Sequence, residues 1–142
     1  MAATNHTPIY QLNQWESSDQ VLRGDFNEDN QKIEAALATI PHIATGSYVG
    51  TGSYGSANPN TLTFDFVPQM VAVVINAGTG CEYGTLLVRG QTKSGGIGVA
   101  QAALHGLDLT LAWEGNSVSW YSSGSSDQLT DSGVTYFYFA IG

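Results

Sequence analysis

The chain has 142 residues, and twelve acidic residues against four Lys and Arg give it a formal net charge of −8. This length allows one compact domain with its own core and an appendage. So few cations exclude a nucleic-acid-binding protein, because neutralising phosphates requires clustered Lys and Arg, and they also argue against an anionic membrane as partner. Charged residues make up only 11% of the chain, which suits an extracellular or virion protein better than a cytosolic enzyme.

The composition changes near residue 41, which predicts a chain of two parts. Residues 1–40 hold eight of the sixteen charged residues, whereas the longer remainder holds the other eight. Glycine is concentrated in the second part, since Gly24 is the only one of 17 that precedes residue 41. We therefore predict an N-terminal α-helical segment over residues 1–41 and an antiparallel β-sandwich head over residues 42–142.

The N-terminal segment is predicted to begin with a short extended stretch over residues 7–12, because the residue before Pro8 avoids helical backbone angles. Residues 17–19, which are Ser-Ser-Asp, are expected to cap a short helix that continues through Leu22. A second helix is expected to start at Asp25, which is followed three residues later by Glu28 in a pattern that resembles a capping box.

This second helix carries a heptad seam, in which one Asn and four apolar residues recur at spacings of four and three. A lone helix of this length is marginal in water, so the seam predicts partner helices, and the buried Asn would set their register. The alternative is a short amphipathic helix that packs on its own head domain. Pro41 is expected to end the helix. The seam positions are Phe26, Asn30, Ile33, Leu37 and Ile40.

The head is predicted to be all-β, because apolar residues alternate along it and its turns are rich in Gly, Asn and Ser. Met70–Ile75 is a continuous apolar run, which is typical of a strand buried on both faces. Gly115-Asn116 is a two-residue hairpin signal. The other predicted strands are 61–66, 85–89, 107–113, 118–120 and 134–141.

A run of residues near the N-terminus carries a resemblance to a known family. Its parts are Thr7-Pro-Ile-Tyr-Gln-Leu-Asn-Gln-Trp15, Asp19, Arg23-Gly-Asp-Phe-Asn-Glu-Asp-Asn30, Lys32-Ile33 and Ala35-Ala36-Leu37. This run resembles the N-terminal segment of tail proteins from phages and prophages of Gram-positive bacteria. The resemblance implies that the segment attaches to a phage tail and that the protein is a homotrimer.

The head is similar to phage tail-fibre head domains and, more weakly, to H-type lectins, on the residues Phe64-Asp-Phe66, Pro68, Val71–Val73 and Tyr136–Gly142. H-type lectins are antiparallel sandwiches that assemble as trimers and bind sugars of the N-acetylgalactosamine type. The resemblance therefore implies a trimeric head that binds carbohydrate. Residues 78–106 depart from the lectin pattern with a Gly-rich stretch, so the lectins' sugar-binding residues cannot be carried over.

Sugar sites require flat aromatic faces for the apolar side of the ring and fixed polar groups for its hydroxyls. Trp113 and Trp120 flank the predicted hairpin and are expected to lie close together, while Tyr121 is expected to be exposed; the alternative is that these aromatic residues belong to the core. Arg89 and Lys93 are the only cations of the head and could contact a sugar or form intersubunit ion pairs. The candidate glycan contacts are Trp113, Trp120, Tyr121, Tyr83, Asp108, Asn116, Asp127 and Arg89.

The sequence predicts a protein that is not an enzyme and has no cofactor. A glycosidase requires paired carboxylates across a cleft, but those of the head fall at turns or on outward positions. Gly-x-Ser-x-Gly and phosphate-loop motifs are absent. We predict no metal site, although His42 and His105 could meet carboxylates on a three-fold axis. Cys81, the only cysteine, is expected to be buried.

These features together predict a trimeric phage tail-fibre adhesin that binds host-surface glycans. The chain has no signal-peptide pattern over Met1–Gln11 and no apolar run of the ~18 residues that a membrane helix needs, so we expect synthesis in a bacterial cytoplasm and release by lysis within a virion. One alternative is a purely structural tail or baseplate component. Another is a small polysaccharide hydrolase, which would release sugars.

Overall fold

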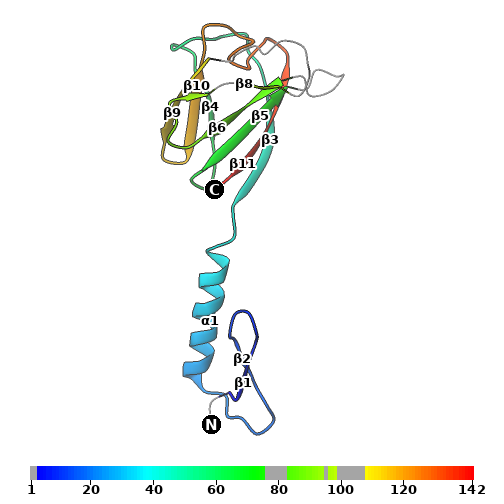
Figure 1. The fold of residues 1–142 in the computed structure, drawn as a ribbon, viewed down its shortest axis with the longest axis vertical. Coiled ribbons are helices and arrows are strands. Elements are labelled where there is room, and N and C mark those ends of the chain that lie inside the picture. Colours follow the sequence, from blue (N-terminus) through cyan, green and yellow to red (C-terminus); the bar gives the residue numbers. More distant parts are fainter. Residues whose placement is uncertain (1–2, 76–82, 95, 99–107) are drawn as a thin grey trace. The chain divides into compact units, whose positions relative to one another are not determined.

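The computed structural model describes residues 3–75, 83–94, 96–98 and 108–142, and it divides into two compact units, Met1–Pro41 and His42–Gly142 (Figure 1). The described chain is mainly β, with antiparallel sheets and a single short helix. The prediction of a mainly β, antiparallel fold is thereby confirmed. Within these ranges the structure contains no helix that combines the length and the apolar character needed to cross a bilayer.

The first unit begins with a small hairpin of β1 (Asn5–His6) and β2 (Asn13–Gln14). Its loop closes because the Thr7 N–H donates to the Leu12 carbonyl at 2.8 Å and the Gln11 N–H donates to the Thr7 carbonyl at 3.1 Å. The extended stretch predicted over residues 7–12 is therefore wrong. Pro8 sits in a turn, where its fixed backbone angle is equally well suited.

The short helix predicted after residues 17–19 is also absent, because Asp19 is engaged in a turn instead. Its carboxylate accepts hydrogen bonds from the Glu16 N–H at 2.9 Å and from the Thr4 hydroxyl at 2.8 Å. The hydrogen bond from the Glu16 backbone is the main cause of the lowered pKa of Asp19, and the bond from Thr4 adds to it. A carboxylate that holds a local turn offers the chain an alternative to helix, as Asx turns do.

Helix α1 spans Arg23–Leu37, so it begins two residues before the predicted start and ends four residues before Pro41. Leu22 precedes it without a side-chain cap, and Asp25 lies in the first turn, where its charge favours the helix dipole. The predicted capping box is therefore wrong. Ala38–Ile40 form a turn whose N–H groups bond back to the last carbonyls of the helix, which ends α1 before Pro41 can act.

The hairpin is held against α1 by Asp29. Its carboxylate accepts hydrogen bonds from the Asn13 N–H at 3.0 Å and from the Asn13 side-chain amide at 3.0 Å. The Lys32 ammonium donates to the Gln11 carbonyl at 2.8 Å and pairs with Glu28 at 2.9 Å. These polar contacts position the hairpin, and α1 has no buried residue.

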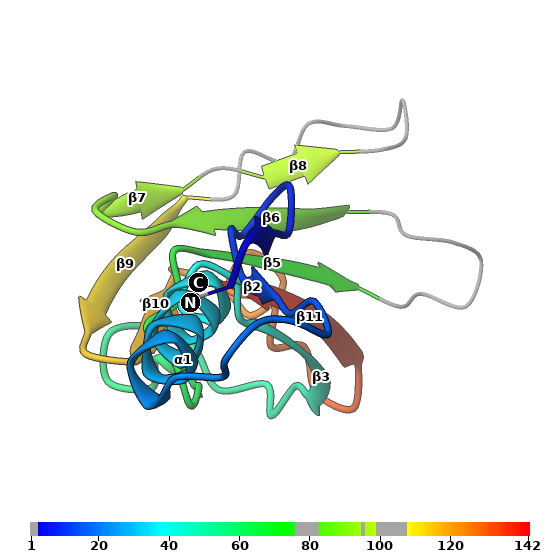
Figure 2. The same ribbon diagram turned by 90° about the horizontal axis from the view of Figure 1, so that it is seen from below.

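The second unit is a β-sandwich-like head made of two antiparallel sheets (Figures 1 and 2). One sheet has the order β3 (Ile43–Val49), β11 (Thr135–Ile141), β5 (Met70–Ile75), β6 (Tyr83–Val88) and β8 (Gly96–Gly98). The other has the order β4 (Asn60–Thr63), β10 (Ser117–Tyr121), β9 (Leu109–Glu114) and β7 (Lys93–Ser94).

The two edges of the sandwich differ. On one side β7 pairs with β9 and β8 pairs with β6, so neighbouring stretches of chain belong to different sheets and join them. On the other side β3 ends one sheet and β4 ends the other. This second edge leaves the gap between the sheets to be filled by side chains alone.

The core lies between the sheets and contains residues from both. Trp120 and Leu109 come from the four-stranded sheet, and Tyr136, Val73 and Leu87 come from the five-stranded sheet; all are essentially buried. Burying aromatic and aliphatic side chains of this size contributes about 1.5–3 kcal/mol each, before the opposing entropy is counted. The alternation of buried residues along each strand follows from the two-residue period of a pleated strand.

Several predicted strands are confirmed and others are corrected. β5 has the predicted bounds, but only every second residue is buried, so it is not a strand covered on both faces. β4 ends at Thr63, before the buried Phe64 and Phe66, because the Phe64 N–H bonds to the Asn116 carbonyl of the β9–β10 hairpin. Gly115-Asn116 forms that hairpin as predicted, while Leu107 lies outside the described residues.

Candidate functional site

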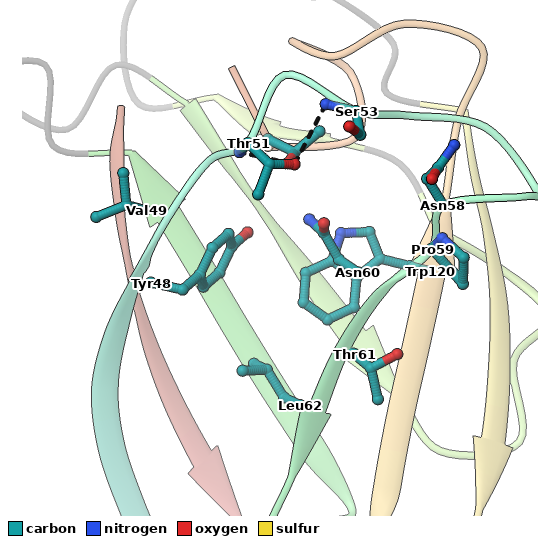
Figure 3. Close-up of a pocket in the computed structure, with 11 residues that line it drawn as sticks. Tyr48, Val49, Thr51, Ser53, Asn58, Pro59, Asn60, Thr61, Leu62 and Trp120 are labelled. Carbon is teal, nitrogen blue, oxygen red and sulfur yellow. Dashed lines mark hydrogen bonds between the residues drawn. The ribbon is translucent and has the colours of Figure 1, made fainter. Parts of the chain in front are cut away.

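A hollow among the described residues lies at the open edge of the sandwich, between β3 and β4 (Figure 3). We call it the edge pocket. It has a volume of about 430 Å³, which falls within the range of small-molecule sites. The residues that line it carry no charge. They are Tyr48, Val49, Thr51, Ser53, Asn58, Pro59, Asn60, Thr61, Leu62, Trp120 and Thr130.

Aromatic rings form the inner wall of the edge pocket. Tyr48 of β3 and Leu62 of β4 extend into the gap from opposite strands, with Trp120 of β10 behind them (Figure 3). The Tyr48 ring lies 6.2 Å from Trp120 in an edge-on arrangement and stacks on Tyr136 at 5.2 Å. Offset and edge-on geometries of this kind stabilise aromatic pairs beyond simple burial.

The phenol of Tyr48 is fixed by its surroundings. Its hydroxyl donates a 2.8 Å hydrogen bond to the Leu129 carbonyl. Burial, together with the neighbouring Tyr136, raises the pKa of Tyr48 well above its ordinary value of about 10. The hydroxyl therefore remains a neutral donor at any physiological pH, and the ring is held in one orientation.

The rim of the edge pocket consists of hydroxyl and amide groups. The Thr51 hydroxyl accepts a hydrogen bond from the Ser53 N–H at 3.2 Å, and the Thr51 N–H donates to the Thr130 hydroxyl at 3.3 Å (Figure 3). Asn58 and Thr61 are exposed beside them. Such groups can donate and accept hydrogen bonds without carrying charge.

Gln128 joins the two loops that surround the pocket, residues 50–59 and 122–134. Its side-chain oxygen accepts hydrogen bonds from the Gly55 N–H at 2.8 Å and the Ser122 N–H at 3.0 Å. Its side-chain amide donates to the Asn58 carbonyl at 2.7 Å. Because Gln128 is fully buried, each of these bonds replaces hydration that the group has lost.

Leu129 follows with a left-handed backbone, at φ 60, although it is fully buried and is not glycine. That conformation costs roughly 1–2 kcal/mol for an ordinary residue. It turns the Leu129 carbonyl so that it accepts the hydroxyl of Tyr48 at 2.8 Å and the amide of Asn60 at 3.3 Å. A strained backbone conformation persists where the surrounding contacts hold it in place. Here the Leu129 carbonyl in turn holds Tyr48 and Asn60 of the pocket wall.

A second hollow, of about 300 Å³, brings together three of the head residues that the sequence singles out. The Lys93 ammonium lies 3.0 Å from the Asp108 carboxylate, and Tyr121 and Ser122 line the same hollow. The ion pair lies within one chain and is largely exposed, so it contributes little stability. The Ser122 hydroxyl is buried and has no hydrogen-bond partner.

The two tryptophans predicted to share a site have different cross-strand partners. Trp113 lies opposite Val118, whereas Trp120 lies opposite Leu111. The Trp120 N–H donates to the Gln128 carbonyl at 2.9 Å, inside the core. The two side chains lie on one face as diagonal cross-strand neighbours, a spacing that aromatic rings can bridge, but Trp120 is buried whereas Trp113 is only partly buried.

Arg89 is engaged in holding the turns at the opposite end of the head. It lies 5.0 Å from the Trp113 ring and donates to the Pro68 carbonyl at 2.6 Å and to the Gly115 carbonyl at 2.7 Å. The Asn116 side chain donates to the Phe64 carbonyl in the same region. These hydrogen bonds give both side chains structural roles.

The remaining candidates are dispersed or lie outside the described residues. Asp127 is half-buried in the 122–134 loop. His42 stacks on Phe66 at 5.5 Å, and within the described ranges no three His, Cys, Asp or Glu residues gather closely enough to hold a metal ion. The side chain of Tyr83 and all of Cys81 and His105 lie outside the described residues.

The sequence reasoning missed most of the edge pocket, including Tyr48 and Asn60, and it also missed Gln128, which joins the loops around the pocket. The echo of Gly46-Ser47-Tyr48 in Gly52-Ser53-Tyr54 was visible, but it did not indicate that only Tyr48 faces inward. Comparisons of the chain with models of protein families, with curated proteins and with solved structures found no match.

Proposed function

We propose that this chain is the receptor-binding subunit of a bacteriophage-type tail fibre, acts as a homotrimer, and binds host-surface glycans in the edge pocket of its head. The observation that carries the proposal is the chemistry of that pocket. It combines a fixed aromatic ring, that of Tyr48 with the buried Trp120 behind it, with a rim of hydroxyl and amide groups and no charged side chain. Aromatic faces and uncharged hydrogen-bonding groups match the two sides of a sugar ring.

The neutral lining favours an uncharged sugar. The chain has a net charge of −8, so an anionic ligand would be repelled at long range and would find no cation among the pocket residues. Neutral hexoses and N-acetylhexosamines present hydroxyls and amides that Thr51, Ser53 and Asn58 can bind, and they would interact with the protein without burying an unpaired charge.

The homotrimer is supported by the exposed seam of α1. Phe26 and Leu37 are each 59% exposed and Ile33 is exposed as well, whereas Ile40, the last predicted seam position, is exposed in the turn after the helix. An apolar stripe at heptad spacing on a helix with no buried residue is stable in water only when partner helices cover it. Three heads on one stalk would convert weak binding of single sugars into firm attachment, since later contacts form within one complex.

Attachment to a tail is supported by the resemblance of residues 7–37 to phage and prophage tail proteins. The hairpin β1–β2 and α1 carry that sequence and form a unit of their own. The protein would therefore be made in a bacterial cytoplasm and released within a virion on lysis. It would need no enzymatic activity, cofactor or metal for this role.

One observation favours the alternative of a purely structural tail or baseplate component. The polar atoms of Tyr48, Trp120 and Asn60 are already bonded to the backbone of residues 128–129. The inner wall of the pocket is thus explained by the stability of the head alone. The two functions differ in the rim, because only a glycan-binding head requires the rim groups to remain accessible.

The test measures binding of the full-length protein to host cell walls and to a bacterial glycan array, with two matched variants. Thr61→Arg places a bulky cation at the edge pocket, and Thr63→Arg places the same side chain two residues along β4, outside the pocket. Saturable binding that Thr61→Arg abolishes and Thr63→Arg retains would support the proposal. Absence of binding by the folded wild-type trimer would favour the structural alternative.

A further inference from the structure

The outer face of the five-stranded sheet has a composition that a solvent-facing sheet does not normally have. Register across β3, β11, β5 and β6 aligns Ile43, Ile141, Met70 and Val88 in one row. The next outward row aligns Thr45, Phe139, Ala72 and Leu86, and the third aligns Ser47, Phe137, Val74 and Gly84. We call these three rows the outer sheet face.

The outer sheet face carries no charged residue, and its only polar residues are Thr45 and Ser47 on the edge strand β3. Its opposite face is the core, because Val71, Val73, Leu87 and Tyr136 alternate with these residues and are buried. Phe137 and Phe139 are 42% and 40% exposed, and Ile43 is 60% exposed. A one-sided antiparallel sheet normally alternates apolar inward and polar outward residues, so an apolar outer face indicates a covered surface.

The side chains of the outer sheet face differ in size. Phe137 and Phe139 stand on the same strand, β11, and their neighbours across both adjacent strands are smaller: Ser47, Thr45, Val74 and Ala72. The two rings are therefore the largest apolar side chains of this face. Aromatic rings of this kind are enriched at protein interfaces, where they supply a large apolar contact area.

We propose that the outer sheet face is the contact between the head domains of neighbouring copies of this chain. The charge distribution favours a second copy as the occupant. Copies with a net charge of −8 repel one another, and a face without charge is a surface through which they can approach without placing like charges in contact.

The stalk would add to this association, and here the inference rests on the proposed homotrimer. Residues 38–42 form a short connection between α1 and β3. Helices that associate would therefore hold the heads at a high effective concentration, so that even a modest apolar contact would be occupied. The outer sheet face would thereby fix the heads with respect to one another.

The test uses the full chain and separates the heads from the stalk. Ile33→Asp with Leu37→Asp disrupts the α1 seam, and self-association is then measured by sedimentation equilibrium. Residual association should persist in this background, and adding Thr45→Arg should weaken it by at least roughly tenfold in Kd. Thr63→Arg, an exposed strand position in the other sheet, should leave it unchanged and controls for the added charge.

Met70 provides a native reporter, because it lies on the outer sheet face. Its oxidation by peroxide should be slow in the wild-type oligomer and fast when Thr45→Arg is present. Rapid Met70 oxidation in an intact wild-type trimer would overturn the inference while leaving the proposed trimer and its glycan binding intact.

A monomeric wild-type protein would overturn both the trimer and the inference. Head association that survives loss of the seam would support the inference even if no glycan binds.

Discussion

The indole N–H of Trp120 donates a 2.9 Å hydrogen bond to the carbonyl oxygen of Gln128, inside the head domain. The side chain of Gln128 accepts hydrogen bonds from the Gly55 and Ser122 N–H groups and donates one to the Asn58 carbonyl. One buried glutamine thus connects the core tryptophan to both loops at the edge pocket. The shape of the pocket depends on this residue, although its side chain is not part of the pocket wall.

Replacing Gln128 should therefore destabilise the head. Gln128→Ala leaves the buried Ser122 N–H, the part-buried Gly55 N–H and the Asn58 carbonyl without this partner, and we expect a loss of ~3 kcal/mol in the free energy of unfolding. Denaturant unfolding followed by tryptophan fluorescence measures it. Gln69→Ala, at an exposed side chain, should change stability by less than ~0.5 kcal/mol. Equal effects of the two variants would contradict the bridging role of Gln128.

Because the Tyr48 hydroxyl is buried, we expect the head to lose stability at alkaline pH. Burial raises the pKa of Tyr48 in the folded state above the value of about 10 that it has when unfolded. Because the neutral phenol is favoured by folding, its contribution is fully present below about pH 10 and is lost as the pH rises further. Absorbance titration at alkaline pH should show Tyr48 ionising only with unfolding. Tyr48→Phe should remove this part of the alkaline destabilisation, and an unchanged alkaline profile would be evidence against it.

Arg89 should matter for stability, whereas Lys93 should not. Arg89 bonds two carbonyls and lies over Trp113, so Arg89→Ala should cost ~2 kcal/mol. Arg89→Lys should recover little of this, because an ammonium cannot reproduce the planar fork. Lys93→Ala, which breaks an exposed ion pair, should cost less than ~1 kcal/mol. Thermal unfolding of the three variants checks this order, and a larger effect at Lys93 would refute it.

Two glycines should respond in opposite directions to alanine. A Cβ on Gly24 in α1 would meet nothing within 4 Å, so Gly24→Ala should stabilise the helix by ~0.5–1 kcal/mol. A Cβ on Gly50 would overlap the backbone of Thr130 and Asp131, so Gly50→Ala should destabilise the head by more than ~2 kcal/mol. Circular dichroism on heating separates the two effects. A stable Gly50→Ala head would show that the 50–59 and 122–134 loops are not closely packed.

Sequence reasoning succeeded where structure is local and failed where it is not. The bounds of β5 were predicted from its continuous apolar run and the β9–β10 hairpin from the Gly115-Asn116 turn, because both signals lie in consecutive residues. The helix was predicted from its seam, but it starts before the predicted residue. Asp19 holds a turn instead of capping a helix, and α1 follows Leu22, which has no capping side chain. β3 was missed, since its inward positions include Gly46 and Ala44, which give a weak periodic signal.

The sequence by itself determined that this chain is mainly β with a helical segment near its N-terminus, because strand alternation and heptad spacing are properties of neighbouring residues. Only the tertiary structure decided which groups share a site. The edge pocket assembles Tyr48, Asn60 and Trp120 from three strands, and Gln128 is buried at no cost in lost hydrogen bonds only because Gly55 and Ser122 meet it there. The same holds for the outer sheet face, since its apolar rows form only when strands far apart in sequence pair in register.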